Sequence, residues 1–366
     1  MAKQADQTFS ARLIAWHRRQ GRHDLPWQGT HDPYRIWLSE IMLQQTQVAA
    51  VIPYYRRFLE RYPTLPELAV APVEQVMGLW SGLGYYARAR NLHRCAQVVM
   101  ERHGGEFPRH PDVIAQLPGI GRSTANAIAA FCFGARAAIL DGNVKRVLCR
   151  AYAIEGYPGA PAVEKTLWEL AEALLPQRGS TNMAIYIQAQ MDLGATVCTR
   201  TKPRCLADPA SCPLAGSCVA RAQGRIAELP VARPRKALPQ RAAQVLLLLD
   251  GDKVLLERRP ASGIWGGLLS LPELPAGAEP LAHAARTLGC QVERLTALTP
   301  LRHGFTHFQL TLQPLSGAAK LLPHAAEMAG YCWLGRAEIG AAALPSPIRK
   351  ILETAFQAQA ASAIPV

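Results

Sequence analysis

The hydrophobic pattern of the sequence changes near residue 240, and this change restricts the possible folds more than any other feature. From residue 8 to about 195, apolar residues recur with helical spacing in segments separated by Pro, Gly and Asp. After Arg241 the apolar runs become short and read as strands. We therefore expect a mostly α-helical domain, residues 1–224, a basic Pro-containing linker, residues 225–240, and an α+β domain, residues 241–366.

The second domain is expected to start with a β-hairpin. The runs AAQVLLLL and KVLLERR flank the sequence DGD, which places Asp250 and Gly251 in the turn. The segments FTHFQLTLQPL and GYCWLG read as further strands, whereas EPLAHAARTLG and PSPIRKILETAFQAQAA read as helices.

The net charge of +13 over 366 residues favours a polyanionic partner. Ribosomal, nucleic-acid and membrane-surface proteins share this bias, so charge alone does not identify the partner. No apolar run reaches the roughly 18 residues of a membrane-spanning helix. The N-terminal stretch MAKQADQTFSARLIAWHRRQ lacks the apolar core of a signal peptide. We expect a soluble protein of a bacterial-type cytosol, acting without a membrane, where disulfides are rare.

The stretch SEIMLQQTQV, Ser39 to Val48, contains a carboxyl group beside an apolar helix face. We expect a continuous helix here, because no Gly or Pro occurs from Tyr34 to Ile52. Its apolar stripe comprises Trp37, Ile41, Val48 and Ile52. Glu40, next to this stripe, is either an ordinary surface charge or a carboxylic acid whose pKa is raised so that it can donate a proton.

The segment LPGIGRSTANAIAAF, residues 117–131, combines a Gly-containing turn with a helix of small residues. Gly119 and Gly121 permit a tight turn and leave backbone N–H groups exposed at the helix start, where a phosphate binds well. An ordinary turn between helices is the alternative, but this pattern is typical of the helix-hairpin-helix of DNA repair proteins. Asp141, in AILDGNVKRVL, caps the next helix or faces a ligand, and the two roles are compatible.

Four of the nine cysteines are crowded into one short segment. They are Cys198, Cys205, Cys212 and Cys218. In an intracellular protein this density indicates a metal centre more than disulfides, and zinc is the generic metal. The other cysteines are scattered, several in apolar stretches, and read as buried structural thiols.

Six runs of the sequence are characteristic when taken together. They are LPWQ, WLSEIMLQQTQVAAVIPYY, LWSGLGYYARARNLH, LPGIGRSTA, LDGNVKRVL and QMDLGATVCTRTKPRC. They resemble the MutY-type adenine DNA glycosylases of the helix-hairpin-helix glycosylase superfamily, densely over residues 8–220 and more thinly after 240. The resemblance implies a helical catalytic domain with a [4Fe–4S] cluster and a C-terminal Nudix-like domain. The implied substrate is double-stranded DNA with adenine opposite 8-oxoguanine or guanine, bound by a monomer.

The resemblance also implies the chemistry of base excision repair. Glu40 is then the general acid that protonates adenine and later the base toward water. Asp141 would stabilise the oxocarbenium-like sugar, and Asn143 would position the water or the sugar. Relatives that also cut the strand carry Lys in place of Ser123, for Schiff-base chemistry. We therefore expect hydrolysis of the base without efficient strand cleavage, and a phosphate contact for Lys145.

Several DNA contacts follow from the same resemblance. Gln45 and Tyr85 would wedge into the duplex beside the oxidised base, next to Gln44. The alternatives are a polar helix surface for Gln45 and a core position for Tyr85. Residues that match the adenine-pocket region are Trp27, Gln28, Leu43 and Gln188.

The resemblance assigns the four crowded cysteines to the [4Fe–4S] cluster, with one departure. The gap between Cys205 and Cys212, LADPAS, is longer than in the family. A loop absorbs extra residues at small entropic cost, so we still expect the cluster. Basic residues around it, Arg200, Lys202 and Arg204, are expected to touch DNA phosphates.

The segment LLERRPASGIWGGLLSLPEL resembles the Nudix-like lesion-recognition module of the family. The following segment, EPLAHAARTLGCQVERL, lacks the acidic run with which Nudix hydrolases bind magnesium, so nucleotide hydrolysis is not expected. Phe305, Thr306 and His307 correspond to the lesion-reading turn, in which the Thr306 hydroxyl bonds to the oxidised purine. An ordinary strand turn with a buried Phe305 is the alternative.

Two other functions are compatible with parts of the sequence. The first is a pyrimidine-specific glycosylase with lyase activity, of the endonuclease III type, against which Ser123 and the C-terminal domain argue. The second is a DNA-binding protein that has lost catalysis, against which the presence of both Glu40 and Asp141 argues.

Overall fold

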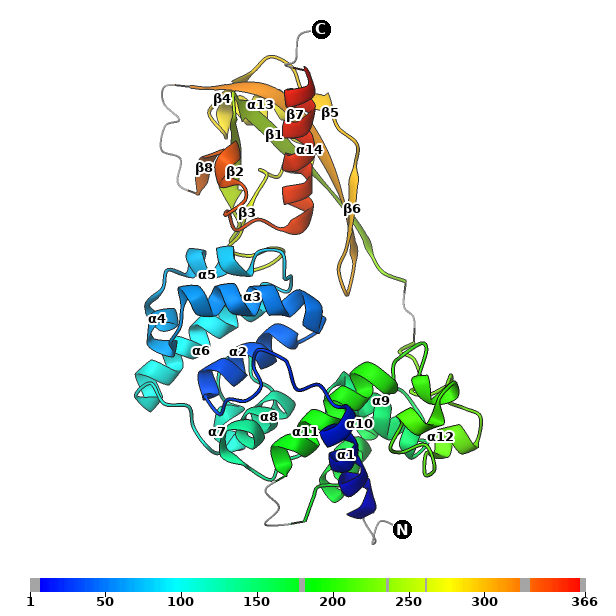
Figure 1. Cartoon of the computed structure of the whole chain (residues 1–366). Helices are drawn as coiled ribbons and strands as arrows, with labels where there is room; N and C mark the ends of the chain where they lie inside the picture. The colour runs from blue at the N-terminus through cyan, green and yellow to red at the C-terminus, as the bar shows by residue number, and fades with distance from the viewer. Residues whose placement is uncertain (1–6, 178–181, 235–236, 261, 323–329, 363–366) are drawn as a thin grey trace. The chain divides into compact units, whose positions relative to one another are not determined.

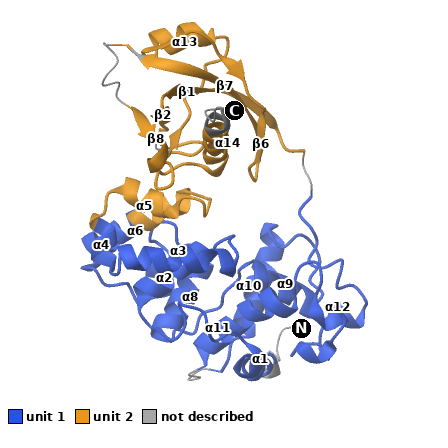
Figure 2. Ribbon diagram, turned by 45° about the horizontal axis from the view of Figure 1, so that its top comes forward, with its two compact units in different colours: residues 1–69, 94–235 blue, residues 70–93, 236–366 orange. Residues whose placement is uncertain are grey.

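The computed structural model describes residues 7–177, 182–234, 237–260, 262–322 and 330–362. Contacts between residues divide the chain into two units (Figure 2). Unit 1 comprises residues 1–69 and 94–235, and unit 2 comprises residues 70–93 and 236–366. Residues 235 and 236 of the predicted linker lie outside the described part, and the predicted domain limits stay a prediction.

Unit 1 is built from α-helices (Figure 1). Its helices are α1 (Gln7–Gln20), α2 (Pro33–Leu43), α3 (Val48–Arg61), α7 (Pro111–Ile114), α8 (Arg122–Phe133), α9 (Gly142–Ala151), α10 (Pro161–Ala173), α11 (Met183–Asp192) and α12 (Val219–Ala222). A π-helical segment, η1 (Leu193–Val197), continues α11, and the 3-10 segments η2 (Arg204–Leu206) and η3 (Pro209–Ser211) follow. Helices α4 (Leu65–Val70) and α6 (Ala87–His103) pass from one unit to the other. Within the described residues, strands begin only at Gln240, as the change of period predicted.

The main core of unit 1 joins α1, α8, α9, α10 and α11. Each helix turns an apolar stripe inward, since burial of apolar surface stabilises the packed state. Fully buried members of this core are Leu13, Leu148, Leu167, Tyr186 and Ile187. The packing fixes the starts of α8 and α9 and one side of α11, where predicted site residues lie.

The helix predicted through SEIMLQQTQV is not continuous, and the prediction was wrong at this point. Helix α2 ends at Leu43 and α3 begins at Val48, with Gln45 between them at φ 59°. The absence of Gly and Pro gave no sign of this break, because a residue other than Gly rarely adopts the left-handed region. Val48 and Ile52 therefore belong to α3, whereas Trp37 is fully buried on α2.

Helices α7 and α8 enclose the predicted hairpin turn. Gly119 lies in this turn at φ 76°, a conformation that favours glycine. Gly121 is the N-cap of α8 and makes no side-chain cap hydrogen bond. The first N–H groups of α8 are therefore available to an external acceptor such as a phosphate.

Unit 2 contains a mixed sheet with the central order β3-β2-β1-β7-β4 (Figure 1). Strand β8 pairs with β2, and β5 and β6 pair with β7. The strands are β1 (Gln240–Asp250), β2 (Lys253–Arg258), β3 (Leu269–Ser270), β4 (Cys290–Val292), β5 (Thr296–Ala297), β6 (Leu301–Gly304), β7 (Gln309–Leu321) and β8 (Tyr331–Gly335). Strands β1 and β7 run parallel, from Gln240 opposite Gln309 to Leu249 opposite Ala318, and the other pairs are antiparallel.

Both faces of β1 are buried, which explains its uninterrupted apolar run. On one face Leu247 packs in a cluster with residues of α14 (Ser346–Ser362), and on the other Leu248 packs in a cluster with α13 (Pro280–Arg286). The hairpin differs from the prediction by one residue, because Asp250 pairs with Lys253 and leaves Gly251 and Asp252 as the turn. In the described part of the chain no helix is both long and apolar enough to cross a membrane.

Helix α5 (Val73–Trp80) and the loop that follows it belong to unit 2 by their contacts, although they stand within the helical part of the sequence (Figure 2). The first residues of the predicted linker pack instead on unit 1, where Ile226 and Leu229 are buried beside Cys205.

Candidate active site

A cavity of about 560 Å³ in unit 1 brings many of the predicted site residues together. Its walls come from the end of α2, the turn before α3, the starts of α8 and α9, and α11. The predicted residues on its surface are Trp27, Glu40, Leu43, Gln44, Ser123, Asp141, Asn143 and Gln188. Two carboxyl groups that are far apart in the sequence therefore open onto the same hollow.

Glu40 lies in the last turn of α2, between the buried Ser39 and Ile41. Burial, and to a smaller extent the nearby negative charge of Asp141, raise the pKa of the Glu40 carboxyl to about 8. Because this pKa lies above neutral pH, Glu40 carries its proton at pH 7. Glu40 thus lines a cavity wall instead of lying on the outer surface, and its role as proton donor stays a prediction.

Glu40 also lines a second cavity, of about 330 Å³. Trp27 and Gln188 border both cavities. Gln28 borders only the smaller one, where its side chain accepts from Leu25 N at 3.1 Å and donates to Arg22 O at 2.9 Å. Gln28 thus holds the turn before α2 in shape, a role that its type alone did not indicate.

Asp141 caps α9 and faces the cavity, so the two roles left open by the sequence occur together. Its Oδ1 accepts from Val144 N at 2.8 Å, and its Oδ2 accepts from Asn143 Nδ2 at 3.2 Å. Burial raises the pKa of Asp141, and these hydrogen bonds together with the charge of Arg146 oppose the rise. Asp141 therefore has donors that stabilise its anion, while Glu40 is the carboxyl kept protonated.

Arg146 orients Asn143, and the sequence analysis missed it. Its Nη2 donates to Asn143 Oδ1 at 2.8 Å and to Gly194 O at 2.7 Å, and its Nε donates to Cys198 O at 2.7 Å. This leaves the Asn143 amide NH2 to face Asp141. A Cβ on Gly194 would lie 2.5 Å from Asn143 Cβ, so the close approach of η1 to α9 requires glycine here.

A buried acid, Asp192, supports the opposite wall of the cavity and was also missed. It is fully buried and accepts from Arg22 N at 2.8 Å, Arg22 Nε at 2.9 Å and Gln188 Nε2 at 2.8 Å. Burial alone would raise the pKa of Asp192, but hydrogen bonds from His17 and Arg22 outweigh it and lower the pKa. Asp192 thus accepts one N–H group of the Gln188 amide and holds this side chain in place at the cavity wall.

No lysine lines the described wall of the 560 Å³ cavity. Ser123 stands at the second position of α8, and its Oγ accepts from Leu140 N at 2.9 Å. Lys145 Nζ lies 2.7 Å from Glu164 Oε1, an ion pair on the neighbouring helix α10. Lys145, the lysine nearest to Asp141 in the sequence, is thus paired with a carboxylate.

Neither of the two predicted wedge residues is among the residues that line the 560 Å³ cavity. Gln45 is exposed in the turn between α2 and α3 and does not line it. Tyr85 belongs to unit 2, is 49% exposed and adopts φ 52°, so it does not occupy the core position that was its alternative. An exposed aromatic ring on a strained backbone is a feature of functional sites.

Phe305, Thr306 and His307 form the turn between β6 and β7. Phe305 N donates to Phe308 O at 2.9 Å, and Thr306 and His307 are exposed. Phe305 stacks on Phe308 at a ring distance of 4.4 Å and meets His303 edge-on at 4.8 Å. The turn is therefore a packed aromatic unit that presents a hydroxyl and an imidazole to solvent.

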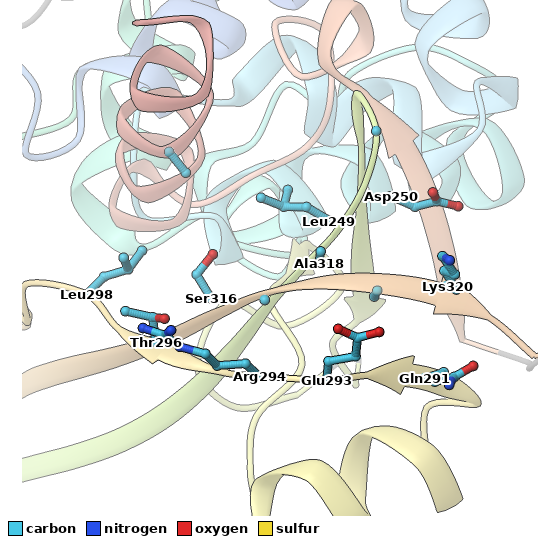
Figure 3. Close-up of a pocket in the computed structure, with 14 residues that line it drawn as sticks. Leu249, Asp250, Gln291, Glu293, Arg294, Thr296, Leu298, Ser316, Ala318 and Lys320 are labelled. Carbon is cyan, nitrogen blue, oxygen red and sulfur yellow. The ribbon is translucent and has the colours of Figure 1, made fainter. Parts of the chain in front are cut away.

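Unit 2 also contains a cavity of about 970 Å³ beside β4, β5 and β7 (Figure 3). Its lining includes side chains of both charges, among them Asp250, Glu293, Arg294 and Lys320. The lining contains no predicted site residue, and its mixed charge gives no preference for a polyanion.

The four crowded cysteines, Cys198, Cys205, Cys212 and Cys218, line one small and largely apolar cavity. In the described ranges no group of three or more His, Cys, Asp or Glu side chains converges closely enough to hold a metal ion. All four cysteines thus border one common space. The long LADPAS loop does not remove Cys205 or Cys212 from this space. Arg150 Nη1 lies 3.4 Å from Cys198 Sγ, where it can balance thiolate charge.

Comparisons with known proteins agree with this architecture. A profile described as "HhH-GPD superfamily base excision DNA repair protein" matches residues 38–173, and a profile described as "NUDIX domain" matches residues 244–354. Among solved structures, one described as a thermostable thymine-DNA glycosylase is similar, with a TM-score of 0.51 and 30% identity over 60% of this chain and 97% of that chain.

Two relatives are similar over most of the chain. The adenine DNA glycosylase of Buchnera aphidicola subsp. Acyrthosiphon pisum (strain APS) is 34% identical over 94% of this chain and 97% of its own length. The adenine DNA glycosylase of Homo sapiens is 35% identical over 96% of this chain and 74% of its own length.

Proposed function

The chain belongs to the adenine DNA glycosylases of base excision repair, and from that premise we propose that it hydrolyses the N-glycosidic bond of adenine mispaired with 8-oxoguanine or guanine. The observation that carries the proposal is the shared cavity of Glu40 and Asp141, in which Glu40 has a pKa of about 8. Two carboxyls on one hollow, one of them protonated and the other hydrogen-bonded in a way that stabilises its anion, are the pair that glycoside hydrolysis requires.

In the proposed mechanism the flipped adenine enters the 560 Å³ cavity between Trp27, Leu43 and Gln188. Glu40 donates its proton to a ring nitrogen of the base, which makes adenine a better leaving group. The electron pair of the glycosidic bond leaves with the base, and the sugar becomes oxocarbenium-like. The Asp141 carboxylate, fixed by Val144 N and Asn143, stabilises this cation. Glu40 then accepts a proton from the water that adds to the sugar.

The carbonyl of Gln188 supplies selectivity for adenine in this proposal. Its amide NH2 donates to Asp192, and its carbonyl oxygen is proposed to face the cavity as an acceptor. An acceptor pairs with the exocyclic amine of adenine, whereas guanine and thymine present a carbonyl oxygen at the corresponding position and leave two acceptors face to face.

The reaction is proposed to stop at the abasic site. A lyase step needs an amine that attacks the sugar, whereas position 123 holds serine and Lys145 is paired with Glu164. Strand cleavage without alkali is therefore expected to be negligible.

The four thiols around the apolar cavity are proposed to hold a [4Fe–4S] cluster, which supplies charge and rigidity to the loop when bound. Arg150 fastens this loop by donating from Nη1 to Thr199 O at 2.7 Å and from Nη2 to Arg200 O at 3.1 Å. The exposed side chains of Arg200, Lys202 and Arg204 are then held where a DNA backbone can meet them.

The β6–β7 turn is proposed to read the oxidised base opposite adenine through the exposed Thr306 and His307.

The first N–H groups of α8 after Gly121 are proposed to hold a phosphate of the same duplex. The protein is proposed to act as a monomer on DNA in the cytosol, with a helical catalytic part and a Nudix-like recognition part.

The experiment that tests the function uses an end-labelled duplex with one adenine opposite 8-oxoguanine. Products are analysed with and without hot alkali after incubation with the full chain. Cleavage that needs alkali supports hydrolysis of the base alone. Cleavage without alkali would instead indicate a lyase, and binding without base loss would indicate a protein that has lost catalysis.

A further inference from the structure

The loop between α5 and α6, residues 81–86, carries the strained Tyr85. Gly82 and Gly84 adopt φ 95° and 79°, and Tyr85 itself adopts φ 52°. Because the flanking glycines make the loop flexible in principle, its shape must come from contacts. Trp80 Nε1 and Arg88 Nη2 both donate to Gly84 O, at 3.1 and 3.2 Å.

Contacts from the C-terminal part of the chain complete this support. Leu344 O accepts two hydrogen bonds, from Ser81 Oγ at 3.0 Å and from Tyr86 Oη at 3.1 Å. Arg349 Nη2 donates to Ser81 Oγ at 3.0 Å, and the Tyr86 hydroxyl in turn accepts from Gly82 N at 3.3 Å. Both ends of the loop are thus tied to one carbonyl.

Arg349 is itself fixed, so it can act as a rigid support. Its Nη1 donates to Ile339 O at 2.6 Å, and its Nη2 also donates to Ala342 O at 2.9 Å. On the other side of the loop, Arg90 Nη1 donates to Gly266 O at 2.6 Å. Helix α5 is close as well, because a Cβ on Gly78 would lie 3.2 Å from Ala341 O.

These hydrogen bonds explain why the Tyr85 ring is exposed. Tyr86 is buried with its hydroxyl on Leu344 O, whereas the adjacent Tyr85 points outward, with the Arg88 guanidinium 5.4 Å from its ring centre. The left-handed backbone of Tyr85 is what turns two consecutive tyrosines to different sides. Releasing Tyr86 and Ser81 removes the contacts that hold this conformation.

We propose that Ser81, Tyr86 and Arg349 are positioning residues through which the Nudix-like part of the chain holds Tyr85 ready to enter the DNA duplex beside the mispair. The proposal rests on the proposed function and adds a second route by which this part acts on DNA, separate from the β6–β7 turn. The loop stands within the segment that matches the helical repair family, residues 38–173, yet Leu344 and Arg349, which support it, lie far outside that segment.

The test is a double-mutant cycle in the full chain. The first variant is S81A with Y86F, which removes both donors to Leu344 O and no ring. The second is Tyr85→Ala, and the third combines all three changes. Affinity is measured for a duplex with 8-oxoguanine opposite a 2′-fluorinated adenine nucleotide, which resists hydrolysis because fluorine disfavours the oxocarbenium-like state. Single-turnover rates are measured with ordinary adenine.

We expect the S81A and Y86F variant to weaken DNA binding roughly five- to twentyfold, as two lost hydrogen bonds imply. Adding these changes to Tyr85→Ala should cause no further loss, because the supports act through Tyr85. Losses that multiply in the combined variant would overturn the proposal. The variant S81T keeps the hydroxyl at this position. Unlike S81A, it should therefore bind DNA with nearly the wild-type affinity.

Two controls keep the result interpretable. Arg336→Ala removes an exposed arginine of the same unit, whose guanidinium lies 5.9 Å from the Phe356 ring centre, and should leave DNA affinity unchanged. Thermal unfolding compares the folding of all variants, and the single variant S81A replaces the double variant if the double variant unfolds.

If the wild type releases no adenine, the proposed function fails. If it releases adenine and the losses multiply, only the positioning role fails.

Discussion

Glu40→Gln changes the group on which the proposed chemistry depends, and its consequences can be worked from the pKa. With a pKa of about 8, roughly 90% of Glu40 is protonated at pH 7, whereas at its ordinary value of 4.5 only about 0.3% would be. The environment therefore raises the population of the acid roughly 300-fold. Gln is nearly the same shape but donates no proton to a leaving base.

General acid–base catalysis contributes roughly 10²–10⁴-fold to a rate. Glu40 is proposed to act first as acid and then as base. We therefore expect the single-turnover rate of adenine release by the variant to be lower than the wild-type rate by a factor of about 100 or more. Binding to the mispair should persist. A variant that releases adenine at the wild-type rate would refute the assignment of Glu40.

The same substitution should stabilise the fold at high pH. The folded pKa of Glu40 lies above the unfolded value, so the folded state binds more protons between pH 4.5 and 8. Wild-type stability is therefore lost as pH rises through this window, by up to about 5 kcal/mol for a shift from 4.5 to about 8. Solvent in the cavity reduces this upper limit.

Thermal unfolding of both proteins at pH 4.5 and pH 8.5 measures the effect. We expect nearly equal midpoints at the lower pH and a midpoint several degrees higher for Glu40→Gln at the higher pH. A difference that does not change with pH would show that burial does not perturb this carboxyl.

Three further substitutions test other parts of the account. Arg146→Met removes the donor that orients Asn143, and should lower the single-turnover rate roughly tenfold or more while DNA affinity, measured in parallel, stays within about twofold. Thr306→Val keeps the shape and removes the hydroxyl, so the ratio of rates on 8-oxoguanine and guanine mispairs should fall roughly fivefold, and an unchanged ratio would discard this contact. Cys205→Ser should lower the iron content and the visible absorption of the purified protein, whereas Cys332→Ser, a change in strand β8 at a residue that does not line the thiol cavity, should alter neither.

The sequence identified residues of the candidate site more completely than it predicted the geometry around them. Carboxyls at positions 40 and 141 and the four crowded cysteines were identifiable because their residue types and spacing resemble those of the family. The switch from helical to strand pattern near residue 240 was also readable, since β1 is buried on both faces. The family and the two-part architecture follow from these features together.

The break between α2 and α3 could not be predicted in the same way. Residues 44–46, Gln-Gln-Thr, contain neither Gly nor Pro, and the left-handed conformation of Gln45 is imposed by the surrounding structure. This break matters because the α2–α3 turn forms one wall of the cavity.

Arg146, Asp192 and the supports of Tyr85 were missed for a different reason. Each works through contacts with residues distant in sequence, such as Arg146 with Cys198, Asp192 with Arg22 and Ser81 with Leu344. A single sequence records residue types but not which buried charges meet, so these networks appear only in three dimensions.

The pH dependence of adenine release tests the central claim most directly. Single-turnover rates are measured on a duplex with adenine opposite 8-oxoguanine from pH 5 to pH 10. A protonated Glu40 with a pKa of about 8 predicts a rate that does not fall with rising pH until near pH 8 and then falls tenfold per pH unit. A rate that already falls from about pH 5 would contradict the account, because the acid would then be an ordinary exposed carboxyl.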